Sequence, residues 1–163
     1  MLQDYKIGLE TYKLDKKVEW KNAQNEEKIE LNGRILGGCI DILVSLVGTK
    51  FDKVKEFIEK YKNDKIVWFF DNCELTSEGI LRGLWQLKEA GWFSNISGFI
   101  FGRTMTRSSC YGISFEEAVK EVLQELNVPI ILEADIGHLP PQFTIINGAI
   151  VHIVSKDGKG KID

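Results

Sequence analysis

The chain has 163 residues, of which 44% are hydrophobic and 28% are charged, and its formal net charge is −3. This length and mixture suit one domain, residues 1–163, with a real hydrophobic core. The absence of excess positive charge argues against nucleic acid and anionic membranes as partners. No apolar run could span a bilayer, and the opening five residues lack the basic and apolar regions of a signal peptide, so we expect a cytoplasmic protein.

Three cysteines, Cys39, Cys73 and Cys110, lie far apart in the sequence. An odd number at such spacing is no disulfide framework, and the lack of a C-x-x-C pair or neighbouring histidines argues against zinc. We therefore predict three reduced cysteines that are buried like small apolar residues.

The first half of the chain predicts mainly helices. Residues 1–32 are polar, and short edge strands are expected at 18–20 and 28–31, which makes this opening resemble the continuation of a preceding segment. The glycine-rich residues 33–38 are then expected to lead into an apolar helix over 40–47, and a second helix is expected over 54–61.

The second half alternates strands and helices. Continuous apolar runs at 66–70 and 96–101 predict strands buried on both faces, and a third strand is expected at 130–132. Between them, one helix is expected to end at Gly91, and another to begin at Ser114 with a capping box completed by Glu117. The dipeptide Asn147-Gly148 predicts a final hairpin. The fold class is therefore α/β with a mixed sheet.

Two residues are candidates for chemistry. Asp71 ends the apolar strand at 66–70, a position that often carries functional groups in α/β proteins, although Asp-Asn also suits a plain turn or cap. His138 lies between Gly137 and the run Leu139-Pro140-Pro141, which constrains the backbone and leaves the imidazole free for general-base work, with a structural role as the alternative. His152 lies within a predicted strand and is interpreted as an ordinary sheet residue.

A carboxylate and an imidazole are two thirds of a hydrolytic triad, but a nucleophile motif is missing. The sequence has no G-x-S-x-G and no phosphate-binding loop. The segment Ser108-Ser109-Cys110 is a candidate only because it lies in a loop. Gly37-Gly38 is a weak candidate for anion binding at a helix N-terminus. The sequence therefore predicts half of an active site.

Five short segments, in order, resemble the C-terminal domain of the LD-carboxypeptidase family of serine peptidases. They are Leu36-Gly37-Gly38 with Leu46 to Thr49; the strand that ends in Asp71; Leu81 to Leu87 with Ala90-Gly91; Gly98 to Gly102; and Gly137-His138 with Asn147-Gly148-Ala149. Together they cover most of residues 33–155.

The resemblance implies a three-layer β/β/α swivelling domain with a mixed sheet. It also implies that a separate N-terminal domain supplies the nucleophilic serine, while His138 and Asp71 fall on the family's histidine and glutamate. The implied substrate is the amide before a terminal D-amino acid of a murein tetrapeptide, with no metal and no organic cofactor. Homodimers are usual in the family, so the resemblance implies a homodimer, which no residue pattern in the chain indicates.

The chain departs from the family pattern at two residues. Asp71 stands where the family has glutamate, so the carboxylate is one methylene shorter, and Cys39 stands where asparagine is common. Two alternatives to the carboxypeptidase function therefore stay open. One is an amidase of the same fold that inactivates peptidyl-nucleotide antibiotics, and the other is a non-catalytic binding or dimerisation module.

Overall fold

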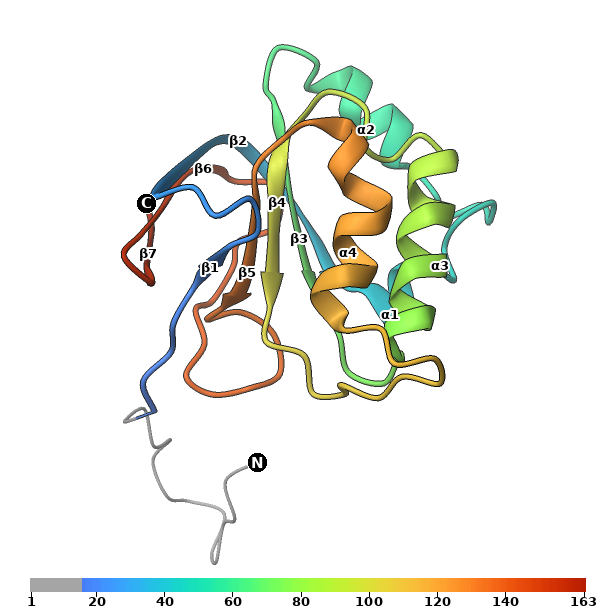
Figure 1. Cartoon of the computed structure of the whole chain (residues 1–163). Coiled ribbons are helices and arrows are strands. Elements are labelled where there is room, and N and C mark those ends of the chain that lie inside the picture. Colours follow the sequence, from blue (N-terminus) through green and yellow to red (C-terminus); the bar gives the residue numbers. More distant parts are fainter. Residues whose placement is uncertain (1–15) are drawn as a thin grey trace, which may run out of the picture.

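The structure, a computed structural model, describes residues 16–163 and contains a seven-stranded mixed sheet with helices packed on one face (Figure 1). The α/β class with a mixed sheet is confirmed. Expectations for residues 1–15 lie outside the described residues.

The strands and helices follow one another as expected for an α/β chain. The strands are β1 (Lys21–Asn22), β2 (Lys28–Cys39), β3 (Ile66–Asp71), β4 (Ile96–Gly102), β5 (Ile130–Ala134), β6 (Ile150–Lys156) and β7 (Lys159–Ile162). The helices are α1 (Ile40–Leu43), α2 (Val54–Lys60), α3 (Ser77–Glu89) and α4 (Phe115–Leu123), with a short 3-10 turn, η1 (Gln124–Leu126). The order in the sheet is β1-β5-β4-β3-β2-β6-β7, in which β2 to β5 are parallel and the other three strands are antiparallel to their neighbours.

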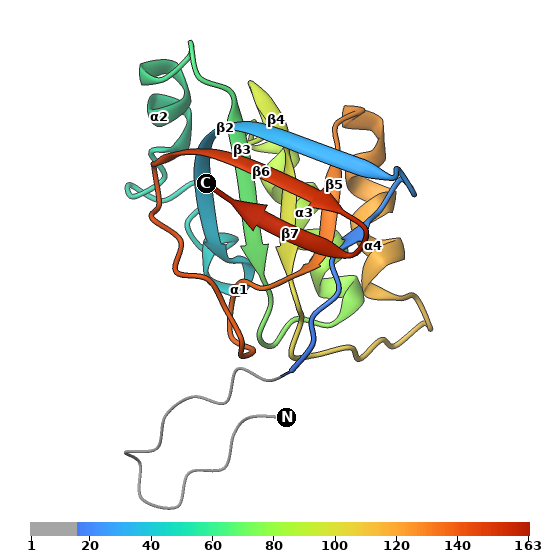
Figure 2. The ribbon, with the colours of Figure 1, turned by 90° about the vertical axis from the view of Figure 1, so that its left-hand side faces the viewer.

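The long strand β2 gives the sheet its curl. Its residues Lys28–Arg34 pair with β6, whereas its residues Arg34–Cys39 pair with β3. Because β2 belongs to both parts of the sheet, β6 and β7 lie over the parallel strands, as Figure 2 shows. The helices on the opposite side complete three layers, β/β/α, which confirms the expected architecture.

Two hydrophobic cores fill the spaces between these layers. The helix-side core contains aromatic residues of β3 and β4, among them Trp68, Phe70 and Phe99. The core between the two parts of the sheet contains Val67, Ile100 and side chains from β2, β5 and β6. Successive residues of β3 thus point into different cores, so the apolar run is buried on both faces as predicted.

The helix α4 begins as the sequence predicts. The Ser114 hydroxyl accepts a hydrogen bond from the Glu117 amide at 3.1 Å, and the Glu117 carboxylate accepts one from the Ser114 amide at 2.7 Å. This reciprocal capping box satisfies two amides that a helix N-terminus otherwise leaves unpaired.

The prediction of short edge strands before residue 33 is wrong for β2. This strand has twelve residues and lies inside the sheet, and Gly37 and Gly38 pair with Phe69 and Phe70 rather than leading into a helix. The helix that follows is also shorter than expected, because hydrogen bonds from residue i to i−3 replace the helical pattern from Ser45 onward. Ile40, Leu43, Leu46 and Val47 still pack on the helix-side core, which explains their helical spacing, whereas Ile42 is exposed.

The hairpin predicted at Asn147-Gly148 is also wrong. The turn lies at Asp157-Gly158 between β6 and β7, where both residues have positive φ, 51° and 72°. That geometry is the type I′ turn that Asp-Gly favours as strongly as Asn-Gly. Asn147 instead makes two hydrogen bonds to the backbone of Gly37, donating to its carbonyl at 2.9 Å and accepting from its amide at 3.2 Å.

Among residues 16–163, no helix combines the length and apolar character that crossing a bilayer requires.

Candidate functional site

The carboxyl ends of the parallel strands gather the candidate residues at one edge of the sheet. Cys39 and Asp71 end β2 and β3 and are directly paired in the parallel ladder. Arg103 follows β4 immediately, and His138 lies in the loop after β5. Such edges are where open α/β sheets bind their ligands, so the topology itself positions the site.

The structure brings the two residues singled out in the sequence into direct contact. His138 Nδ1 lies against Asp71 Oδ2 in a very short polar contact. The Asp71 side chain is 7% exposed, whereas that of His138 is 46% exposed. A buried carboxylate that accepts from Nδ1–H fixes the tautomer in which Nε2 carries no proton. The imidazole is thereby prepared to accept a proton at Nε2, on the side of the ring away from Asp71.

Gly137 makes this contact geometrically feasible. Its φ is +92°, and a Cβ built there would lie 2.9 Å from Asp71 Cγ. Any other residue would therefore combine an unfavourable backbone conformation with a collision against the carboxylate.

Arg103 holds the remainder of the His138 loop. Its guanidinium donates to the carbonyls of Leu139 and Pro141 at 2.6 Å and to that of Pro140 at 3.3 Å. The residue is 7% exposed, and these bonds come from a charged donor in a poorly solvated place. Three successive carbonyls of the loop thus bond to one side chain, that of Arg103, which follows β4. These bonds hold the loop in place although it has no regular secondary structure.

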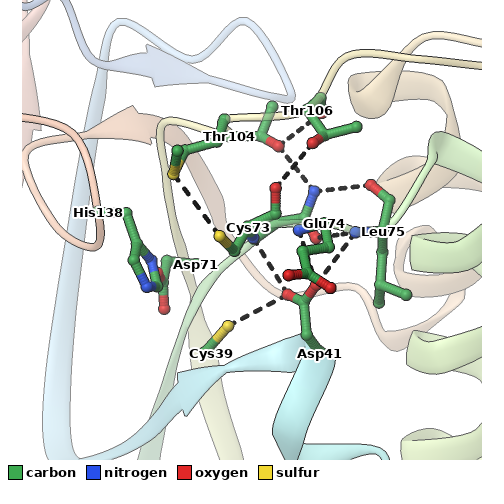
Figure 3. Close-up of polar contacts among 11 residues, drawn as sticks. Cys39, Asp41, Asp71, Cys73, Glu74, Leu75, Thr104, Thr106 and His138 are labelled. Atoms are coloured by element: carbon green, nitrogen blue, oxygen red, sulfur yellow. Dashed lines mark hydrogen bonds and ion pairs between the residues drawn. The ribbon is translucent and has the colours of Figure 1, made fainter. Parts of the chain in front are cut away.

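Asp41 fixes the turn that leaves β3 (Figure 3). Its carboxylate accepts from the amides of Cys73, Glu74 and Leu75 at 3.1, 2.8 and 3.0 Å. Burial acts to raise the pKa of Asp41, but the hydrogen bonds from Cys73, Cys39 and Glu74 outweigh it and hold this pKa below its usual value. The charged carboxylate therefore serves as an anchor for the backbone beside Asp71.

Cys39 lies at the same edge, half-buried, with its Sγ 3.1 Å from Asp41 Oδ2. Burial, the hydrogen bond to Asp41 and the charge of Asp71 raise the pKa of this thiol to about 12. A thiol with so high a pKa is a poor nucleophile at neutral pH. The three cysteines are free, as predicted, but the prediction that they are buried is wrong, since Cys39 and Cys73 are half-buried and Cys110 is exposed.

The other polar candidates lie apart from the His138–Asp71 pair. His152 lies on β6 with its Nε2 3.5 Å from Glu30, in the sheet position expected for it. Ser109 donates to Glu78 at 2.5 Å, and the same carboxylate oxygen accepts from the amides of Cys110 and Tyr111. The loop with Ser108 and Ser109 is therefore attached to the start of α3. No hydroxyl or thiol of residues 16–163 is hydrogen-bonded to His138.

Sequence reasoning missed Asp41, Arg103 and Cys39 as parts of this edge. The available signal was their position directly after strands, because Arg103 follows the apolar run at 96–101 and Cys39 follows two glycines. The partners of Asp41 and Arg103 include backbone groups distant in sequence, which no local pattern encodes.

Comparisons with known proteins give a family and a fold. The profile described as "LD-carboxypeptidase C-terminal domain" matches residues 32–153, whereas no curated protein matches the sequence significantly. The chain is similar to the muramoyltetrapeptide carboxypeptidase from Oxalobacter formigenes, with 20% identity and a TM-score of 0.67 over 85% of this chain and 46% of that one.

Two further solved structures have nucleotide-related ligands. The microcin self-immunity protein MccF in complex with glutamyl sulfamoyl guanosine has 21% identity and a TM-score of 0.66, over 93% of this chain and 41% of that one. An MccF-like protein from Streptococcus pneumoniae in complex with AMP has 24% identity and a TM-score of 0.56, over 89% and 44%. The chain thus spans less than half the length of each of these proteins.

Replacing Gly137 by alanine should break the His138–Asp71 contact, because the new Cβ collides with the carboxylate. NMR of the imidazole nitrogens should then show a mixture of tautomers for His138 in place of the Nδ1-protonated form. Gly148→Ala is the matched control, since Gly148 also has positive φ, +86°, but its Cβ would meet nothing within 4 Å. An unchanged tautomer in Gly137→Ala would contradict this account of the loop.

The stability that Glu78 contributes to the folded protein should be lost in acid. The hydrogen bond from Ser109 and that from the Tyr111 amide lower its pKa from 4.5 to about 2. A lowered folded-state pKa contributes stability above the unfolded-state value, and this contribution is lost as pH falls from 4.5 toward 2. Urea unfolding across that interval should show a shallower loss of stability in Glu78→Gln than in the parent chain. The exposed Glu121→Gln should behave like the parent, and equal slopes in all three proteins would exclude this role for Glu78.

Proposed function

Because the chain belongs to the LD-carboxypeptidase C-terminal domain family, we propose that it is the histidine- and acid-bearing half of a serine LD-carboxypeptidase. The reaction is hydrolysis of the amide before a terminal D-amino acid of a murein tetrapeptide. The observation that carries this proposal is the contact between His138 and buried Asp71 at the carboxyl edge of the parallel strands.

Each residue has a defined part in the proposed reaction. A serine hydroxyl from the N-terminal domain attacks the amide carbonyl, and His138 Nε2 accepts its proton and later delivers it to the leaving amine. Asp71 keeps the proton on Nδ1 and stabilises the imidazolium that forms. No metal or organic cofactor takes part in these steps.

The need for a partner domain is supported by two observations. The chain spans 46% of the length of the Oxalobacter carboxypeptidase, and residues 16–163 offer no hydroxyl that is bonded to His138. The exposed imidazole is therefore free to meet a hydroxyl that another domain presents. A homodimer, which the family resemblance implies, is compatible with a serine on one domain and His138 and Asp71 on another.

The second candidate is an amidase that acts on peptidyl-nucleotide antibiotics. It is favoured by the longer structural match, because the match with the MccF complex covers 93% of this chain and the match with the carboxypeptidase covers 85%. Both substrates contain an amide that the same histidine and acid could help to cleave, so kcat/KM for a murein tetrapeptide and for a peptidyl-sulfamoyl nucleoside separates the two. The remaining alternative, a non-catalytic module, requires that neither substrate is cleaved even in the two-domain protein.

The chain alone should release no D-alanine from tetrapeptides that end in L-lysine–D-alanine or diaminopimelate–D-alanine. Without the serine, the general base has no hydroxyl to activate. D-alanine release can be followed with a coupled D-amino-acid oxidase assay. The two-domain protein is the positive control, and turnover by the 163-residue chain alone would refute the proposed division.

In the two-domain protein, His138→Ala should lower kcat by roughly 10⁴- to 10⁶-fold, because a triad loses most of its effect with its base. His152→Ala is the matched control and should leave kcat unchanged. Near-normal kcat in His138→Ala, with the fold confirmed by circular dichroism, would remove His138 from the mechanism.

The variant Asp71→Glu of the two-domain protein distinguishes a working aspartate from a decayed triad. We expect no gain in kcat, and a large gain would indicate decay.

A further inference from the structure

Three metal-binding donors converge at the edge of the sheet. A Cys39 sulfur, an Asp71 carboxylate oxygen and a His138 ring nitrogen lie within 4.8 Å of one another. They come from the ends of β2 and β3 and from the loop after β5. No other group of three such residues within residues 16–163 meets the same criterion.

The donor set suits zinc and similar thiophilic ions. Thiolate, imidazole and carboxylate bind Zn²⁺ at about 2.0–2.3 Å, so donors in a tetrahedral site lie about 3–4 Å apart. A bound ion therefore requires His138 Nδ1 and Asp71 Oδ2, now in very short contact, to move apart, and the Cys39 sulfur to move slightly closer. The 46% exposure of the His138 side chain gives an ion access from solvent and leaves the fourth position to water.

The local charge also favours a cation. Asp71 is buried beside Cys39, and Asp41 Oδ2 lies 3.1 Å from the Cys39 sulfur. Among the ion pairs of the described part of the chain, none joins Asp41 or Asp71 to a lysine or arginine. Two carboxylates thus face this small volume, and among residues 16–163 the one basic group in ion-pair contact with either of them is His138, which is neutral when it binds a metal.

We propose that Cys39, Asp71 and His138 form a binding site for a thiophilic divalent cation such as Zn²⁺, with water as the fourth ligand. The ion takes the position between Nδ1 and the carboxylate, and the Cys39 thiol releases its proton to solvent when the Sγ–metal bond forms. The bound ion and the His138–Asp71 hydrogen bond exclude each other. If the proposed hydrolysis holds, the ion is consequently a reversible inhibitor of it.

Co²⁺ is the probe for this site, because four-coordinate Co²⁺ has visible absorption and its bond to thiolate adds a near-ultraviolet charge-transfer band. We expect the 163-residue chain to bind one Co²⁺ with both features, and Zn²⁺ to displace it. Cys39→Ser should abolish the charge-transfer band, and His138→Ala and Asp71→Asn should each weaken binding by at least about tenfold. The double variant Cys73→Ser/Cys110→Ser is the matched control and should keep the full spectrum.

Three outcomes would overturn the proposal: no thiolate band in the parent chain, a band that persists in Cys39→Ser, or a band that the Cys73/Cys110 variant loses. Thermal melts without metal identify any variant that fails to fold. If a variant fails to fold, a measurement on the parent chain takes its place. Zn²⁺ should protect Cys39 of the parent from an alkylating reagent, as measured by mass spectrometry, and a Cys39 that Zn²⁺ leaves unprotected overturns the proposal. Because none of these measurements depends on turnover, their failure leaves the proposed hydrolysis intact.

Discussion

The parallel pairing of β2 with β3 and of β3 with β4 determines where Cys39, Asp71 and Arg103 lie. In that register Cys39 lies opposite Asp71, and Arg103 leaves the neighbouring strand at the same edge. A shift of β2 by one residue would turn its side chains to the other face and exchange the two cores. The alternation of β2 itself, with Ile35 in the core between the two parts of the sheet and Leu36 against the helix-side core, opposes such a shift. The packing of two separate cores is therefore also what keeps the polar edge in register.

The loops at this edge are held mainly by side chains that bond to backbone groups. Asp41 accepts from three amides and Arg103 donates to three carbonyls, so one anion and one cation organise the two segments that carry Asp71 and His138. Bonds of this kind satisfy buried backbone groups that lack a helical or strand partner. They also explain how His138 can be exposed and yet fixed, because its backbone is constrained while its ring reaches solvent.

Local patterns were sufficient for much of the fold. The strands β3, β4 and β5 and the helix α4 depend on apolar runs and a capping box that neighbouring residues specify, and the sequence predicts them. The full length of β2 could not be predicted, because its glycines and charged residues form a strand only where β3 and β6 offer ladders on both sides. The hairpin was misplaced because two turn dipeptides compete, and the contact of Asn147 with Gly37 is not a local property.

The candidate site divides in the same way between local and distant information. Asp71 and His138 could be identified because each follows a strand in a distinctive local setting. Their anchors could not, since the donors and acceptors of Asp41 and Arg103 lie more than thirty residues away along the chain. The convergence of Cys39 with the pair was invisible for the same reason, because metal-site recognition from sequence depends on short ligand spacings.

The shorter acid at residue 71 is matched by the closeness of the loop that carries the histidine. An aspartate reaches less far than the glutamate implied by the family resemblance, which would leave a gap if the loop stayed in place. The loop does lie close to the shorter acid, because Gly137 has no Cβ and its backbone can approach the Asp71 side chain more closely than any other residue could. A longer carboxylate at residue 71 would have to fold back or displace this loop. The pairing of Asp71 with Gly137 is therefore a self-consistent geometry for holding an imidazole, and the two residues constrain each other in any variant.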